Sequence, residues 1–333
     1  MYPAGKCDIY SMIKNGFIGL LFLLSFCKAN SQRILIPTDT LNRFRFNTAV
    51  AFSAVTYTGF AAGLYNVWYR KFDREPFHLF NDLGEWNHLD KAGHFYTSYF
   101  QGVLCYKGAR WTGLNKRKSM ITGMILGNIF QTTIEVMDGF SSKWGFSLSD
   151  MGANMAGIAA FGIQQHYWDE QRISVKISSI PVNYPTELIF SADGKRQTTL
   201  ATRAAALYGG NFFEKYLKDY NAQTYWLSFN IHSLLPRGNH WPTWLNIATG
   251  YGAENMFGGF SNTWENDGAV FTVDDRRYPR YRQYYISFDI DLPRIKTNKP
   301  WLKTLFSTIN IFKIPSPALE INTRGQVVFH LLR

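Results

Sequence analysis

The chain has 333 residues, of which 46% are hydrophobic and 17% aromatic, and its formal net charge is +11. This length is ample for one large or two medium domains stabilised by apolar burial. No nucleic-acid-binding motif accompanies the positive charge, so nucleic acid is excluded as the expected partner and an anionic lipid surface is favoured.

The N-terminus has the pattern of an export signal. Two lysines precede an apolar stretch, residues 17–26, which has secretory length and is short for a membrane span. Small residues at Ala29 and Ser31 predict cleavage before Gln32. Residues 1–31 are therefore expected to be the signal peptide of an exported chain.

The cysteines bear on anchoring and on cross-linking. Cys27 raises the alternative of lipidation, but a lipidated cysteine normally follows a small residue and Phe26 precedes it here. Plain cleavage is therefore favoured. The mature chain would keep Cys105 alone, so no intramolecular disulfide is expected.

The stretch from Phe46 to Tyr69 carries no charged residue. It is long enough to span a bilayer. Its polar residues and its small residues, such as Gly59 and Gly63, favour instead a helix packed closely against other helices. A membrane span is the weaker alternative.

Three further helices are expected at residues 90–106, 119–137 and 149–168. Asp90 suits the first turn of one helix, and Ser149 suits the N-cap position of another. The intervening residues 107–118 are expected to form a basic connector. Gly123 and Gly127 have the four-residue spacing that permits close approach of helices.

The hydrophobic period changes to two after about residue 170, which is typical of strands. Strands are expected at residues 173–179, 227–231, 244–251, 286–292, 305–314, 318–322 and 326–331, the last two joined by a hairpin loop at 323–325. One amphipathic helix is expected at residues 201–220.

These elements predict an α+β fold. A bundle of about four helices, residues 42–170, is followed by a mainly antiparallel β region, residues 171–333. Aromatic residues near the strand ends are typical of a partial or small outer-membrane barrel. Strict alternation is equally typical of a soluble antiparallel sheet on a helical layer, and both alternatives stay open.

Polar residues at helical spacing interrupt the apolar helices. Because residues three and four apart share a face of a helix, these side chains are expected to form one polar network. The expected members are Asp90, Lys91, His94, Glu135, Asp138, Asp150 and Asn154.

Three interpretations of this network are open. In the first, the network is a structural set of ion pairs that fixes the register of the helices. Alternatively, His94, Glu135, Asp138 and Asp150 bind a divalent metal, the one cofactor considered. In the third, His94 is a general base oriented by Asp90 or Glu135, and Lys91 stabilises negative charge. No nucleophile elbow, metalloprotease signature or phosphate-binding glycine loop is present.

The ordered motifs Asp90-Lys91-x-x-His94, Glu135-x-x-Asp138 and Asp150-x-x-x-Asn154 resemble a known family. It is the YfiM-like family of predicted periplasmic lipoproteins, a domain of unknown function, over about residues 85–165. The resemblance implies an envelope location and a compact helical domain. It brings no established activity.

The sequence thus predicts a non-enzymatic structural or accessory protein of a Gram-negative cell envelope, located in the periplasm or at the outer membrane. The expected partners are the outer membrane or another anionic lipid surface, together with other envelope proteins. The alternative is an envelope hydrolase that acts on a lipid or related substrate through His94, Glu135 and Asp150.

Overall fold

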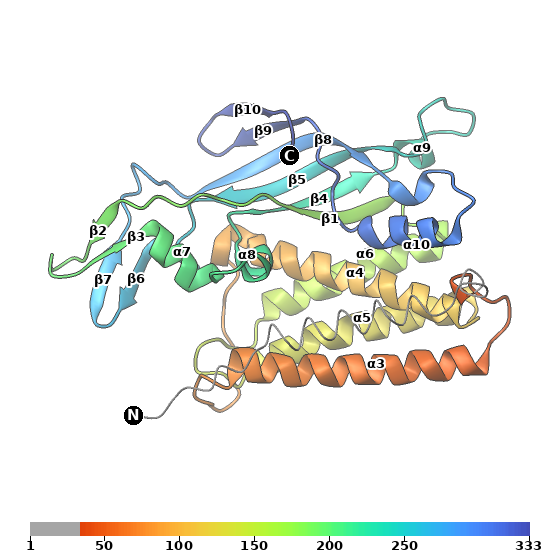
Figure 1. Cartoon of the computed structure of the whole chain (residues 1–333), viewed down its shortest axis with the longest axis horizontal. Coiled ribbons are helices and arrows are strands. Elements are labelled where there is room, and N and C mark those ends of the chain that lie inside the picture. Colours follow the sequence, from red (N-terminus) through yellow and green to blue (C-terminus); the bar gives the residue numbers. More distant parts are fainter. Residues whose placement is uncertain (1–33) are drawn as a thin grey trace.

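The computed structural model describes residues 34–333, apart from the side chains of Val67 and Phe213. The expected signal peptide over residues 1–31 and the question of lipidation at Cys27 lie outside the described residues. A layer of long helices lies beneath a long antiparallel sheet (Figure 1). The predicted α+β fold, helices first and then a mainly antiparallel sheet, is confirmed.

The helical layer contains four long helices. They are α3 (Arg43–Leu64), which continues as the π-helical turn η1 (Tyr65–Tyr69), α4 (Leu89–Trp111), α5 (Lys116–Asp138) and α6 (Leu148–Trp168). The predicted basic connector at 107–118 is wrong, because α4 continues to Trp111. The Asn115 side chain then caps α5 by accepting a hydrogen bond from the Lys118 amide, so the next helix begins early.

Helix α3 is less closely packed than predicted. No residue of α3 is buried, and within the described residues a Cβ atom at Gly59 or Gly63 would meet nothing within 4 Å. Tyr57 and Phe60 instead contact the ring of Phe130 on α5 edge-on. Large rings rather than small residues therefore make the contact. Among the described residues, no helix has the length and apolar character needed to cross a membrane.

Helices α4, α5 and α6 approach one another closely through glycines. A Cβ atom at Gly123 would lie 2.6 Å from the carbonyl oxygen of Gly102, and one at Gly127 would lie 2.7 Å from its nitrogen. The close approach predicted from the spacing of Gly123 and Gly127 is confirmed. These three helices form the compact core of the layer.

The main sheet has six antiparallel strands in the order β1-β4-β5-β8-β9-β10. Their bounds are β1 Ile173–Ser179, β4 Gln223–Phe229, β5 Leu245–Glu254, β8 Tyr281–Ile290, β9 Ala318–Asn322 and β10 Val327–His330. The predicted hairpin of β9 and β10 is confirmed. Two small ribbons pair β2 (Leu188–Phe190) with β3 (Gln197–Thr199) and β6 (Thr263–Asn266) with β7 (Ala269–Thr272).

Several predicted elements of the second half are wrong in kind or extent. The first half of the strand expected at 305–314 belongs instead to the helix α10 (Pro300–Ile309), which Pro300 begins. The helix expected at 201–220 is split into α7 (Leu200–Tyr208) and α8 (Phe212–Lys218), because Gly209 between them has a φ of +89°. Short helical segments complete the chain: η2 (Glu85–His88), α9 (Ile231–Leu234) and η3 (Leu292–Arg294).

The sheet packs on the helices through β1 and β4. Val175 of β1 joins a buried cluster with Tyr99 of α4 and Phe161 of α6. Tyr225 of β4 contacts the ring of Tyr96 on α4. The polar residues at the start of α4 therefore lie close to the helix–sheet boundary.

Along β8 and β9 the buried side chains are mainly polar and the exposed side chains are apolar. The buried polar residues are Gln283, Ser287, Asp289, Glu320 and Asn322, and the exposed residues are Tyr284, Ile286, Phe288, Leu319 and Ile321. The fully buried ammonium of Lys176 contacts Asp289 at 2.7 Å on the polar face. The C-terminal segment covers this face, with Lys313 over the ring of Trp226 and Arg333 over that of Tyr285.

Replacing Gly157 with Ala is expected to destabilise the helical layer. A Cβ atom there would collide with the carbonyl oxygen of Phe95 and the hydroxyl of Ser98. We expect the free energy of unfolding to fall by about 1–3 kcal/mol in urea titrations. Gly152→Ala on the same helix is the matched control, since its Cβ atom meets nothing within 4 Å. It is expected to stabilise by about 0.5–1 kcal/mol, and equal destabilisation by both variants would contradict this account of the packing.

Candidate functional site

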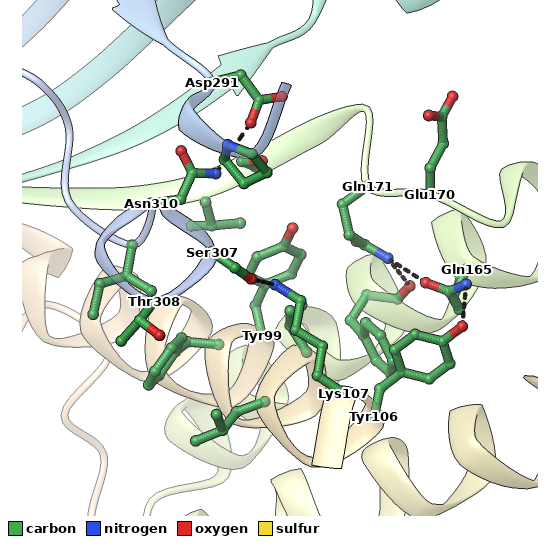
Figure 2. A pocket seen from close by; sticks show the side chains of 18 of the residues that line it. Tyr99, Tyr106, Lys107, Gln165, Glu170, Gln171, Asp291, Ser307, Thr308 and Asn310 are labelled. Carbon is green, nitrogen blue, oxygen red and sulfur yellow. Dashed lines mark hydrogen bonds between the residues drawn. The ribbon is translucent and has the colours of Figure 1, made fainter. Parts of the chain in front are cut away.

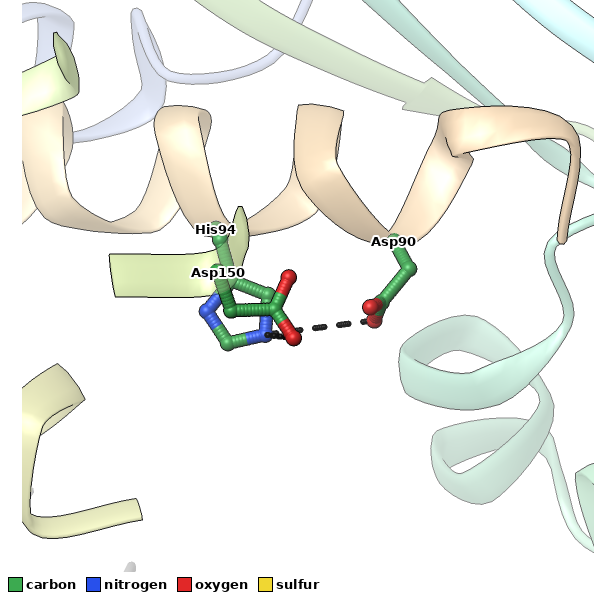
Figure 3. Close-up of side chains that lie close together, drawn as sticks. All are labelled: Asp90, His94 and Asp150. Carbon is green, nitrogen blue, oxygen red and sulfur yellow. Dashed lines mark ion pairs between the residues drawn. The ribbon is translucent and has the colours of Figure 1, made fainter. Parts of the chain in front are cut away.

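The polar residues singled out in the sequence meet where α4 and α6 begin and α5 ends. Asp90, Lys91 and His94 lie in the first two turns of α4, and Asp150 and Asn154 in those of α6. Figure 3 shows Asp90, His94 and Asp150 close together. Glu135 and Asp138 lie in the last turn of α5. All seven side chains are buried or nearly so. We call these residues, together with Asp82, the polar cluster.

The Lys91 ammonium is the centre of the polar cluster. Its nitrogen lies 2.8 Å from Asp82 Oδ2, 2.9 Å from Asp90 Oδ2 and 2.8 Å from Asp150 Oδ1. An ammonium has three N–H donors, so these three carboxylates can take all of them. Lys91 therefore ties the loop before α4 to the starts of α4 and α6.

Asp82 was not among the residues predicted for this network. It lies in the loop before α4, where no helical period points to a shared face. The hydroxyls of Ser147 and Ser149 both donate to Asp82 Oδ1, at 2.5 and 2.6 Å. Ser147, and not Ser149 as predicted, caps α6 by accepting from the Asp150 amide. The loop, the cap and the helix are thereby joined.

His94 lies between two pairs of polar groups. Its Nδ1 is 3.1 Å from Asn154 Oδ1 and 3.6 Å from Glu135 Oε1. Its Nε2 is 3.9 Å from Asp90 Oδ1 and 3.8 Å from Asp150 Oδ2. The predicted candidates His94, Glu135 and Asp150 are thus brought together.

Two tyrosines extend the polar cluster beyond the predicted residues. The Tyr220 hydroxyl, after α8, donates to Asp90 Oδ1 at 2.7 Å. The Tyr69 hydroxyl, after α3, donates to Asp138 Oδ1 at 2.7 Å. Asp138 therefore faces Tyr69. It does not belong to the group of metal-ligating side chains, Asp90, His94 and Asp150, whose ligand atoms lie within 4.8 Å of one another. These partners are distant in the chain, so no local pattern could have identified them.

Burial shifts the ionisation of the carboxyl groups unequally. Burial, together with the charge of Asp138, raises the pKa of Glu135 to about 8, and burial raises that of Asp138 to about 7. Burial and the charge of Asp90 also raise the pKa of Asp150. Burial opposes ionisation of Asp82, but hydrogen bonds with Asp150, Lys91 and the two serines hold its pKa well below its usual range. The cluster thus holds more carboxyl groups than cations can neutralise.

Two cavities are found among the described residues, and the second of them reaches Tyr69. One of about 370 Å³ lies between α4, α6, β1 and α10 and is lined by Tyr99, Lys107, Gln165 and Asp291 among others (Figure 2). The other, of about 330 Å³, lies beside Tyr65, Tyr69 and Met137. Neither of these two cavities is lined by His94, Asp90 or Asp150. Neither of the two therefore provides a substrate site beside these three residues.

Comparison with known families gives a match over residues 79–165, described as "Predicted periplasmic lipoprotein (DUF2279)". This confirms the resemblance drawn from the motifs, over about a quarter of the chain. The matched segment contains every residue of the polar cluster, and the two tyrosines and the sheet lie outside it. Neither a curated protein nor a solved structure matches the chain. The family description supports an exported, periplasmic location.

Replacing Lys91 with Met is expected to destabilise the fold strongly. The change leaves three buried carboxylates facing one another, and breaking a buried ion pair costs about 3–5 kcal/mol. Chemical unfolding near neutral pH measures this loss. Lys116→Met is the matched control, since the Lys116–Asp169 pair is exposed and contributes roughly 0–0.5 kcal/mol. Equal losses in the two variants would show that Lys91 is not central.

The raised pKa of Glu135 predicts a pH dependence of stability. The folded chain keeps this proton up to about pH 8, while the unfolded chain loses it near the ordinary value of 4.5. The stabilisation is complete below the unfolded pKa and is lost as the pH rises through the folded pKa. The Glu135→Gln variant lacks this dependence. The difference between its free energy of unfolding and that of the natural chain should therefore shift in favour of the variant as the pH rises from about 5 to about 9. Urea titrations with chelator test this, and parallel pH profiles would contradict it.

Proposed function

We propose that this protein is a non-enzymatic structural or accessory component of the Gram-negative cell envelope, held at the outer membrane by the open face of its sheet. One observation carries the proposal. The outer strands expose apolar side chains and bury polar ones, which is the reverse of a sheet whose open face contacts water. An exported, periplasmic location agrees with the family match.

The exposed residues form a continuous apolar patch across three strands. Directly paired residues lie on the same face of a sheet. Tyr284 pairs with Ile321 and Ile321 with Val327, while Ile286 pairs with Leu319 and Leu319 with Phe329. We call these six residues and Phe288 the sheet patch. Their exposed fractions lie between 40% and 66%, so a large apolar surface meets the surroundings.

The surroundings of the sheet patch suit a membrane interface. Tyr284, at one end of the sheet patch, is 49% exposed. Tyr and Trp prefer the level of the lipid headgroups. Exposed Arg324 lies in the turn at one end of the patch, and exposed Lys296 follows the other end of β8 in the chain. Basic groups there complement anionic headgroups.

The alternative of a lipid hydrolase is less well supported by the geometry. A general base must reach its substrate, and the two cavities described above lie away from His94. Lys91, the group expected to stabilise negative charge, already contacts three carboxylates. The non-enzymatic role therefore has the stronger support.

Removing apolar atoms from the sheet patch is expected to weaken membrane binding. The double variant Ile286→Gln with Leu319→Gln replaces two half-exposed apolar side chains that pair across strands. Losing their burial in lipid costs about 2 kcal/mol, which lowers the partition coefficient about 30-fold. Flotation with phosphatidylethanolamine–phosphatidylglycerol vesicles measures this partition.

The matched control is Leu217→Gln with Val270→Gln, which changes two exposed apolar residues outside the sheet patch. This variant is expected to float like the natural protein. Equal flotation of both variants would contradict the sheet patch as the contact. Recovery of the natural protein from cells as a freely soluble periplasmic species would contradict membrane attachment altogether.

A further inference from the structure

We propose that Asp90, His94 and Asp150 bind a divalent metal ion of the zinc class, which links the start of α4 to the start of α6. This site is independent of the membrane role proposed above. Its residues come from two helices that Lys91 already holds together. A metal would add a second link on the other side of the same carboxylates.

Three ligand atoms converge on one point of the polar cluster (Figure 3). His94 Nε2 lies 3.9 Å from Asp90 Oδ1 and 3.8 Å from Asp150 Oδ2, and all three atoms lie within 4.8 Å of one another. Zinc binds imidazole nitrogen and carboxylate oxygen at about 2.0–2.2 Å. Ligands at that distance and near-tetrahedral angles are about 3.4 Å apart. The two distances from His94 exceed this by a few tenths of an ångström, and the two aspartate side chains would turn toward each other to complete the site.

The hydrogen bonding of His94 prepares it as a metal ligand. The Oδ1 of Asn154 can only accept, so the Nδ1 of His94 donates its proton there. In the neutral ring the lone pair is then on Nε2, the atom that faces the two aspartates. Metal-binding histidines almost always donate their other ring proton in this way.

A buried carboxylate supports the same arrangement. Glu135 is 1% exposed, and its Oε1 has no hydrogen-bond partner in the described part of the chain. That oxygen lies 3.6 Å from His94 Nδ1. A metal on Nε2 makes the Nδ1 proton a stronger donor and favours the ionised form of Glu135, whose Oε1 then shares that proton with Asn154 Oδ1. This is the carboxylate–histidine–metal arrangement.

Lys91 does not occupy the proposed ligand atoms. It contacts Oδ2 of Asp90 and Oδ1 of Asp150, while the other oxygen of each carboxylate faces His94. Tyr220 also donates to Asp90 Oδ1, which retains a second lone pair for a metal. Each aspartate can therefore bridge the ammonium and the cation.

The ligand set favours zinc over calcium or magnesium. Those ions prefer six or more oxygen ligands, whereas one imidazole and two carboxylates suit zinc and leave a fourth position for water. The side chains of His94 and Asp90 are 16% and 17% exposed, so an ion can reach them from solvent. The competing arrangement is a protonated His94 paired directly with both aspartates.

Zinc titration of the purified full chain, after treatment with chelator, distinguishes these arrangements. Isothermal calorimetry and elemental analysis should give one zinc ion per chain. Asp150→Asn and His94→Gln should each weaken the affinity about 100-fold or more. His166→Gln, an exposed histidine on the same α6 helix, should bind zinc like the natural chain. Melting curves of the metal-free proteins identify any variant that fails to fold.

X-ray absorption at the zinc edge gives a readout that needs no variant. Nitrogen and oxygen ligands alone are expected, and sulfur scattering would instead place the ion at a cysteine. The proposal is overturned if the natural chain binds no zinc, if sulfur ligands are found, or if the folded Asp150→Asn and His94→Gln variants keep the natural affinity.

Discussion

The pairing of a buried ammonium with carboxylates is the interaction on which both halves of the structure depend. In the helical layer, Lys91 joins three carboxylates from the loop before α4 and from two helices. In the sheet, the fully buried Lys176 contacts Asp289, the Ile290 carbonyl and Asn310. A buried charge without such partners costs several kilocalories per mole, so each lysine admits few arrangements of its neighbours. These contacts explain why the helices and strands adopt one register.

Placing polar groups inside the sheet leaves the apolar residues of the outer strands on its open face. A water-soluble sheet on a helical layer does the opposite, because burial of apolar area is its main source of stability. Contact of the sheet patch with lipid therefore has a lower free energy than its contact with water. The polar cluster belongs to the helical layer and not to the sheet. Its residues all lie in the segment that matches the lipoprotein family. The proposed membrane contact and the proposed metal site thus belong to two different parts of the chain.

Much of the fold and of the polar cluster could be predicted from local sequence patterns. The wrong predictions concern features that depend on contacts between distant parts of the chain. The helical period identified the cluster residues, because spacings of three and four set them on shared faces. Asp82 and Tyr220 were missed because their contacts depend on tertiary packing alone. Residues 305–314 have the apolar, β-branched composition of a strand, yet the helix that begins at Pro300 continues through their first half, to Ile309. Alternation predicted the sheet, but period two cannot tell whether the apolar face is turned inward or outward.

The contact of the sheet patch with lipid is the central claim, and its depth in a bilayer tests it most directly. A nitroxide is attached through Ile321→Cys in a background that lacks the natural cysteines Cys7, Cys27 and Cys105. It reports collisions with oxygen, which concentrates in lipid, and with a water-soluble nickel chelate. The same label at exposed Glu265 on β6 is the reference. In anionic vesicles, position 321 should become accessible to oxygen and protected from nickel, while position 265 stays accessible to nickel. Equal nickel accessibility at both positions would contradict a lipid-facing sheet.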